Sequence, residues 1–149
     1  MIFIPAYGLD NPGLKQDFTI ETGGYEFEVT TISNFDITDY EFNKDEKRLT
    51  FFIFSAVSEN LSEIVIPTNL INGNFTFYLD YEEIKPKVII TDTISFITVE
   101  FPGPGPHKLD IIGTTYLPEF ADIAILVLAT SMFGLILVKS KLQKLFIKQ

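Results

Sequence analysis

The residues whose types and spacing could support chemistry in this chain are its carboxylates. Three lie within residues 36–41, and Asp80, Glu82 and Glu83 flank a predicted turn. Paired carboxylates can perform glycoside hydrolysis, and clustered carboxylates can bind calcium. The spacing of both groups matches no calcium-binding loop, and a glycosidase of this size would lack a substrate cleft. We therefore interpret both groups as a solvated acidic face, and we retain Asp80, Glu82 and Glu83 as a calcium candidate.

The single histidine, His107, restricts the other catalytic possibilities, because cysteine is absent. Neither a disulfide framework nor a zinc or copper site of the usual kind can be built from this inventory. A serine hydrolase would need His107 as its base, yet this residue follows the turn-like run Pro-Gly-Pro-Gly-Pro. We interpret His107 as a surface residue at the start of a strand. The sequence thus predicts a protein that is not an enzyme and has no catalytic residues or cofactors.

The charge of the chain excludes one class of partner. The chain carries 11 basic and 20 acidic residues, and residues 1–138 contain all of the acidic residues but only seven of the basic ones. A surface this acidic repels the phosphate backbone of nucleic acids. We therefore expect no nucleic acid among the partners, and we expect cations or basic surfaces where charge selects the partner.

Alternation of apolar and polar residues identifies the elements that position these side chains. It predicts short strands in the first 116 residues, with turn signals about every 8 to 12 residues. The predicted strands are residues 16–21, 25–31, 35–42, 49–57, 62–66, 75–81, 87–91, 94–101 and 108–113. This pattern is typical of an all-β, immunoglobulin-like antiparallel β-sandwich of seven to nine strands. A closed barrel is the alternative.

Three of these segments support more detailed predictions. The apolar positions change register near Asp39, which indicates a β-bulge. Residues 49–57 are apolar on both faces, and this segment is therefore predicted to be the central and most buried strand. Residues 75–81 alternate most cleanly, and we predict one continuous strand there.

Residues 117–138 are predicted to contain a transmembrane helix. The uncharged part begins at Ile123, and Thr130 and Ser131 are its only clearly polar residues. Counted from Ala121 to Val138, eighteen helical residues, with Asp122 as their only charge, rise about 27 Å. This length is close to the ~30 Å hydrocarbon core of a bilayer. A buried core helix would usually show a polar face, so the composition favours the membrane-spanning interpretation.

The flanks of this helix predict its orientation. Residues 139–149 contain four lysines and no acidic residue, and the positive-inside rule therefore predicts a basic cytoplasmic tail. Residues 14–116 then form one extracytoplasmic domain, and the chain is a single-pass protein of the cell membrane. In that location the sequons at Asn60 and Asn74 are candidates for glycosylation.

Residues 1–13 form an apolar N-terminal stub. The run Met-Ile-Phe-Ile-Pro-Ala-Tyr-Gly resembles the end of a signal peptide, but it lacks a basic n-region and is shorter than a working hydrophobic region. Two interpretations stay open. Either the start codon is assigned too late, or the stub is retained as an apolar N-terminal strand or arm.

Several short motifs between Glu63 and Phe120 occur in the order of a known family. They include residues 64–71 and 77–80, a threonine-rich strand, and the closing run Gly-Thr-Thr-Tyr-Leu-Pro-Glu-Phe. This order resembles a family of surface proteins of ammonia-oxidising archaea that end in a PEF-type C-terminal sorting signal. The resemblance implies that Pro118, Glu119 and Phe120 form the sorting motif.

The residue after this motif departs from the family, because Ala121 stands where a glycine is usual. If the motif is a sorting or cleavage signal, the anchor could be removed or exchanged for a lipid. If it is a plain linker, Pro118 ends the preceding strand, Phe120 lies at the membrane interface and the helix is a permanent span.

Two functions follow as hypotheses. In the first, the protein is an accessory or structural subunit of a membrane complex, and the resemblance makes ammonia monooxygenase the candidate. Its helix would pack against integral membrane subunits through its small residues. These are Ala124, Ala129, Ser131 and Gly134. In the second, the protein is a free-standing cell-surface protein, anchored or sorted through its C-terminal signal and associated with surface-layer protein.

Overall fold

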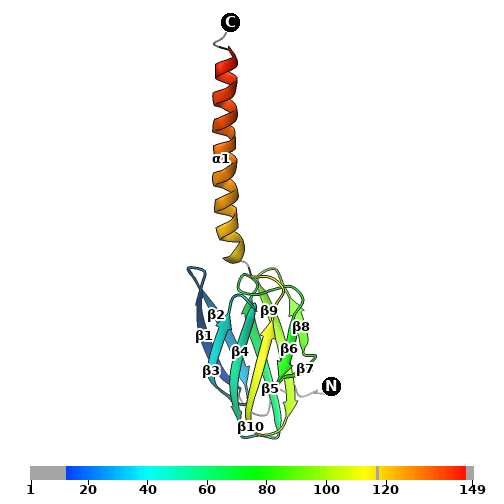
Figure 1. The fold of residues 1–149 in the computed structure, drawn as a ribbon. Coiled ribbons are helices and arrows are strands. Elements are labelled where there is room, and N and C mark those ends of the chain that lie inside the picture. Colours follow the sequence, from blue (N-terminus) through cyan, green and yellow to red (C-terminus); the bar gives the residue numbers. More distant parts are fainter. Residues whose placement is uncertain (1–12, 117, 147–149) are drawn as a thin grey trace, which may run out of the picture. The chain divides into compact units, whose positions relative to one another are not determined.

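The computed structural model describes residues 13–116 and 118–146. The chain divides into two compact units, Met1–Tyr116 and Leu117–Gln149. The first contains a β-sandwich and the second a single α-helix (Figure 1). The predictions for most of the N-terminal stub and for the last three residues of the tail lie outside the described residues.

Within the described residues, ten strands form two antiparallel sheets of five strands each. The strands are β1 Leu14–Thr22, β2 Tyr25–Ser33, β3 Asp36–Asn43, β4 Arg48–Ser55, β5 Glu59–Pro67, β6 Thr76–Leu79, β7 Glu82–Ile84, β8 Lys87–Ile90, β9 Ile94–Pro102 and β10 Gly105–Ile112. Sheet A has the order β1-β2-β5-β9-β8, and sheet B has the order β3-β4-β10-β6-β7. The predicted β-sandwich is confirmed, and the closed barrel is wrong because the strands form two separate sheets.

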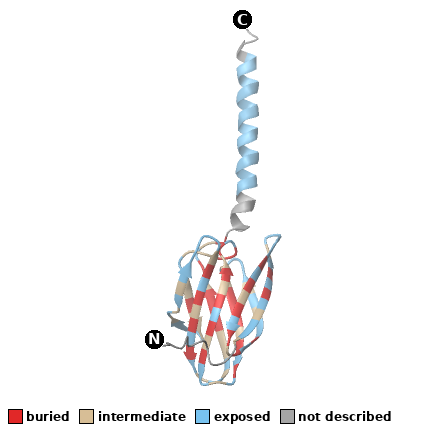
Figure 2. Cartoon of the chain, turned by 180° about the vertical axis from the view of Figure 1, so that it is seen from behind, coloured by how far each residue is buried: buried red, intermediate tan, exposed pale blue. Residues whose placement is uncertain are grey.

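The core lies between the two sheets. Successive side chains of a strand point to opposite faces, so alternate apolar residues meet in the interior. In β2, for example, Phe27 and Val29 are buried whereas Glu26 and Glu28 are exposed. Figure 2 shows this alternation of buried and exposed residues along the strands. The fully buried core includes Val29, Leu49, Phe51, Ile64, Ile66, Leu70, Ile71, Ile97, Val99, Leu109 and Ile111.

The prediction of one continuous strand over residues 75–81 is wrong at its C-terminal end. β6 ends at Leu79, and Asp80 and Tyr81 then adopt φ angles of 50° and 74°. Two consecutive residues with positive φ are typical of a type I′ turn, which matches the twist of the flanking strands. β7 follows at once, with Glu82 opposite Leu79. The alternation of residue types continues through this turn, so the pattern concealed both the turn and a tenth strand.

The other detailed strand predictions are confirmed in part. The β-bulge is confirmed, because the register of β3 against β4 shifts between Ile37 and Asp39. β4 is flanked by β3 and β10, but the middle strand of sheet B is β10, so the prediction of a central strand at residues 49–57 is wrong. Only its inward face is fully buried, since Phe51 has no exposed surface whereas Phe54 is 55% exposed. The prediction that this segment is the most buried strand is confirmed, because five of the eight residues of β4 are buried.

The C-terminal end of the domain is held by contacts with distant segments. Tyr116 is buried, and its hydroxyl lies 2.6 Å from the hydroxyl of Thr22 at the end of β1. Thr115 forms a β-bridge with Asn72. β10, which leads to this end, lies between β4 and β6. The segment that leaves the domain is thus bonded to neighbours up to its last described residue.

The helix α1 extends over Pro118–Phe146, 29 residues that rise about 43 Å. Proline suits the first turn of a helix because its missing N–H would have no partner there. Thr130 donates a hydrogen bond to the carbonyl of Leu126, and Ser131 donates one to that of Leu128. The predicted helix is confirmed, but it is longer than expected and includes most of the segment predicted as a separate tail.

The core predicts a contrast between two phenylalanines of β4. Phe51→Ala is expected to lower the free energy of unfolding of the sandwich by about 3–5 kcal/mol, because it leaves a cavity at a fully buried site. Phe54→Ala, on the exposed face of the same strand, should change it by less than about 0.5 kcal/mol. Urea unfolding of the detergent-solubilised full chain, followed by circular dichroism of the β signal, measures both. Equal losses would contradict this assignment of the core.

Candidate functional site

The helix α1 contains a stretch that is long and apolar enough to cross a bilayer. This stretch, Ala124–Lys144, has 21 residues and a mean hydropathy of 1.8. All of its side chains are exposed. Because Thr130 and Ser131 hydrogen-bond to carbonyls of their own helix, they add little polar surface to it.

The small residues predicted to favour helix contacts are part of this exposed stretch. Ala124, Ala129, Ser131 and Gly134 are all exposed. A Cβ atom placed on Gly134 would meet no atom within 4 Å outside its own helix. Close approach of another helix is sterically possible at this position.

The predicted sorting motif lies at the start of the helix. Pro118, Glu119 and Phe120 belong to the first turn of α1. Their side chains, and that of Ala121, lie outside the part of the chain whose side-chain environment the structure describes. The motif directly precedes the apolar stretch, as both interpretations of it require.

His107 is not the surface residue that the sequence predicted. β10 begins at Gly105 rather than at residue 108, so His107 lies within the strand and its side chain is only 13% exposed. Its ring packs edge to face on Phe101 with centroids 4.9 Å apart. The glycines of the proline-rich run, Gly103 and Gly105, adopt positive φ angles and let the chain pass from sheet A to sheet B.

Both ring nitrogens of His107 have partners. Nδ1 lies 2.7 Å from Oδ2 of Asp80, and Nε2 lies 3.1 Å from the carbonyl oxygen of Gly103. The backbone N–H of Lys108 also donates to Asp80, at 2.8 Å. An imidazolium can donate to both acceptors, whereas a neutral ring can donate to only one. This arrangement fixes the turn between β6 and β7 against β10, and no nitrogen is left to act as a base.

The calcium candidate is not supported. Glu82 and Glu83 are adjacent in β7 and therefore point to opposite faces of the sheet, while Asp80 is turned toward His107 and Lys108. Among the described residues, no group of three His, Cys, Asp or Glu side chains is placed to hold a metal ion. The three carboxylates are neighbours in sequence that the hairpin separates in space.

The carboxylates of residues 36–41 lie on the outer face of sheet B. Asp36, Asp39 and Glu41 are exposed and are paired with Phe54, Phe52 and Thr50 of β4, respectively. Glu41 borders an open depression of about 470 Å³ that Arg48 and Thr50 also line. The side chains line one solvated strand and do not form a facing pair.

Sequence reasoning missed a buried carboxylate on the same sheet. Asp110 is only 5% exposed. It accepts a hydrogen bond of 2.5 Å from Thr50 and pairs with Lys108 at 3.0 Å. The ammonium group of Lys108 also lies 5.1 Å from the ring centroid of Tyr81. The spacing of Lys108 and Asp110 could have indicated this pair, because residues two apart in a strand share a face.

A second ion pair lies on the outer face of sheet A. Lys15 and Thr30 donate hydrogen bonds of 2.9 and 2.7 Å to Asp17. The bond from Lys15, followed by that from Thr30, lowers the pKa of the Asp17 carboxyl. The same bond raises the pKa of Lys15. Both groups are solvent-exposed, so the pair adds little stability.

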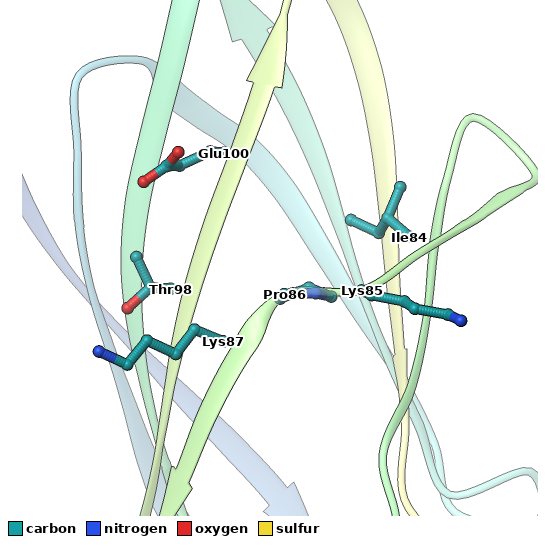
Figure 3. A pocket seen from close by; sticks show the side chains of 6 residues that line it. All are labelled: Ile84, Lys85, Pro86, Lys87, Thr98 and Glu100. Atoms are coloured by element: carbon teal, nitrogen blue, oxygen red, sulfur yellow. The ribbon is translucent and has the colours of Figure 1, made fainter.

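The polar side chains that line a depression near the junction of β7 and β8 do not all point toward one another. The depression has a volume of about 380 Å³ and is lined by Ile84, Lys85, Pro86, Lys87, Thr98 and Glu100. Figure 3 shows that the side chain of Lys85 points away from those of Lys87 and Glu100. The geometry offers no convergent set of donors for a small ligand.

The two predicted glycosylation candidates differ in exposure. Asn60 is 3% exposed, its amide donates to the carbonyl of Gly103 at 2.7 Å, and its oxygen accepts a hydrogen bond from Ser55. The folded domain has no room for a glycan at Asn60, so the structure argues against this candidate. Asn74 is exposed, and its glycosylation stays a prediction.

The His107 contacts predict which turn residue stabilises the sandwich. Asp80→Ala removes two acceptors and places alanine in a left-handed conformation, and it should therefore lower the free energy of unfolding by about 1–3 kcal/mol. Asp80→Asn keeps an acceptor and tolerates this conformation, so the free energy of unfolding should fall by less. Glu82→Ala, at the first position of β7, should cost less than about 0.5 kcal/mol. Thermal unfolding in detergent compares the three variants, and equal effects of Asp80→Ala and Glu82→Ala would contradict the structural role.

Comparisons with known proteins add no family to this description. No family model, no curated protein and no solved structure matches the chain.

Proposed function

We propose that this protein is a non-catalytic accessory subunit of a membrane protein complex, anchored by α1 with its β-sandwich outside the cytoplasm. One observation supports this proposal above all. The apolar stretch Ala124–Lys144 exposes every side chain. Continuous apolar surface of this extent needs lipid or protein around it, and the helix can thus serve both as the anchor and as a contact for other spans.

The charge at the end of the chain supports the orientation. Lys139, Lys141 and Lys144 lie in the last turns of α1, and Lys148 follows. Lysines at one end of a span favour the cytoplasmic side, and their long side chains can extend to the interface from within the helix. The domain at the other end of the helix would then be extracytoplasmic.

The polar groups of the sandwich support a role other than catalysis. Asp80 and Asp110 make structural bonds, and Glu82 and Glu83 point to opposite faces of the sheet. The only imidazole, that of His107, has a partner on each nitrogen. A nucleophile activated by an adjacent base requires such a base to be available.

The proposed identity of the complex rests on the resemblance of the segment from Glu63 to Phe120. Since the motifs resemble surface proteins of ammonia-oxidising archaea, we propose the membrane ammonia monooxygenase as the complex. The exposed small residues of α1, such as Gly134, would permit close contact with its spans.

A second candidate function is favoured by the place of the Pro-Glu-Phe motif at the first turn of α1. A signal directly before an apolar helix suits processing or sorting. The protein would then be a free-standing surface protein that associates with the surface layer, and the helix would be a temporary anchor.

The anchor predicts a specific response to charge in the helix. Glu82→Cys gives the cysteine-free chain one exposed labelling site, and an impermeant maleimide should label it on intact cells. The chain should stay in membranes washed with alkaline carbonate. Leu128→Lys combined with Leu135→Lys should abolish this retention, because a lysine near a helix centre costs about 2.5–3.5 kcal/mol on insertion.

The matched control for this variant is Leu142→Lys combined with Leu145→Lys, which adds the same two charges at the basic end. It should remain in the membrane. The anchor would be refuted if the control were also released, and the orientation would be refuted if Glu82→Cys were labelled only after permeabilisation.

Native purification separates the two candidate functions. After solubilisation in mild detergent, an accessory subunit should migrate with other integral membrane proteins, and its mass should include the lysine tail up to Gln149. A lone monomer would contradict the subunit role. Recovery of the domain in shed surface layers, without its tail, would support the sorted surface protein instead.

A further inference from the structure

The outer face of sheet A carries a continuous apolar patch. Val65, Phe96 and Ile89 lie directly opposite one another on β5, β9 and β8. Ile32 on β2 lies diagonal to Val65, which pairs with Thr30. Directly opposite side chains are about 4.5–5.5 Å apart and diagonal ones about 7–8 Å apart. We call these four residues, Ile32, Val65, Ile89 and Phe96, the apolar patch.

The apolar patch is exposed, unlike the core of the sandwich. Ile89 is 53% exposed, Phe96 41% and Ile32 37%. The same face also carries the exposed Glu63 and Glu100 and, opposite Glu100, the half-buried Leu61. A contiguous cluster of exposed, large apolar side chains is typical of a contact surface.

The chain enters the sandwich at one end of this patch. A Cβ atom on Gly13 would lie 2.6 Å from Cγ2 of Ile32. The backbone just before β1 therefore rests on the side chain of Ile32. Gly13, the first described residue, thus lies beside the patch on the outer side of sheet A.

The composition and reach of the preceding segment fit the patch. Residues 2–9, Ile-Phe-Ile-Pro-Ala-Tyr-Gly-Leu, contain six apolar residues and no charge. The distance from β2 to β8 is three strand spacings, about 14 Å, whereas the chain from Gly13 back to Ile4 can span about 30 Å. The absence of carboxylates within residues 2–9 avoids repulsion by Glu63 and Glu100 on the same face.

We propose that residues 2–9 lie across the apolar patch of their own chain and cover it. Only residues 10–12 separate this segment from Gly13, so its effective concentration at the patch is in the millimolar range, which disfavours a second copy as the cover. Pro5 lacks an amide hydrogen, and this favours packing on the face of the sheet over addition of a strand at its edge. The inference is independent of the membrane role, and it assigns the N-terminal stub a place in the folded domain.

Disulfide trapping in the detergent-solubilised full chain tests this cover. The chain contains no cysteine, so Tyr7→Cys can be paired with Phe96→Cys or Ile89→Cys as its only partner. Mild oxidation should cross-link most molecules of one or both pairs within a single chain. The matched control joins Tyr7→Cys to Phe54→Cys, which is 55% exposed on the outer face of sheet B, and its yield should be at least fivefold lower.

A second measurement tests whether the apolar patch is covered, without the use of a cross-link. The rate of maleimide labelling at Ile89→Cys should rise about tenfold when Ile4→Asp and Tyr7→Asp are added, because the acidic segment leaves the patch. Asn11→Asp, outside the apolar run, should leave the rate unchanged. Circular dichroism confirms that each variant is folded.

Several outcomes would overturn the proposal. Equal trapping at Phe96→Cys and Phe54→Cys would show that the segment does not select the patch. Cross-links only between two chains would identify a second copy as the cover. An unchanged labelling rate at Ile89→Cys, or a native mass that lacks residues 2–9, would show that another partner or the solvent meets the patch.

Discussion

The apolar side chains at every second position of the strands must be kept from water, and the packing of two sheets face to face meets this constraint. The core joins residues far apart in the chain, such as Phe18 and Phe51, whose rings lie 5.3 Å apart. With no cysteine in the chain, this burial replaces the disulfide that often joins the sheets of related architectures. The turns, the register and the placement of polar groups all depend on it.

The sequence predicted those features that depend on side-chain period. The strands have a simple alternation of apolar and polar residues, and the helix has a long uncharged run. The strands and the helix were both found where these patterns predicted them. The bulge near Asp39 was also predictable, because a bulge changes the apolar register. The strand at residues 82–84 was not, since it has three residues and follows a turn set by backbone conformation at Asp80 and Tyr81.

The polar residues were harder to predict because their roles depend on partners distant in sequence. His107 was placed at the surface by its proline-rich context, yet it meets Asp80, 27 residues away. Asn60 lies in a sequon, but its side chain bonds Gly103 across the sandwich. Asp110 is buried beside Thr50, 60 residues distant. A single sequence contains no record of such contacts, so composition could classify these residues only by their average behaviour.

The place of β10 in sheet B has a mechanical consequence. This strand leads to the C-terminal end of the domain and has a hydrogen-bonded neighbour on each side, β4 and β6. A pull on that end would load β10 along its length, so that many hydrogen bonds resist together in shear. The bond between Tyr116 and Thr22 transfers part of the load to sheet A. A domain pulled at this end would therefore resist tension through strands of both sheets.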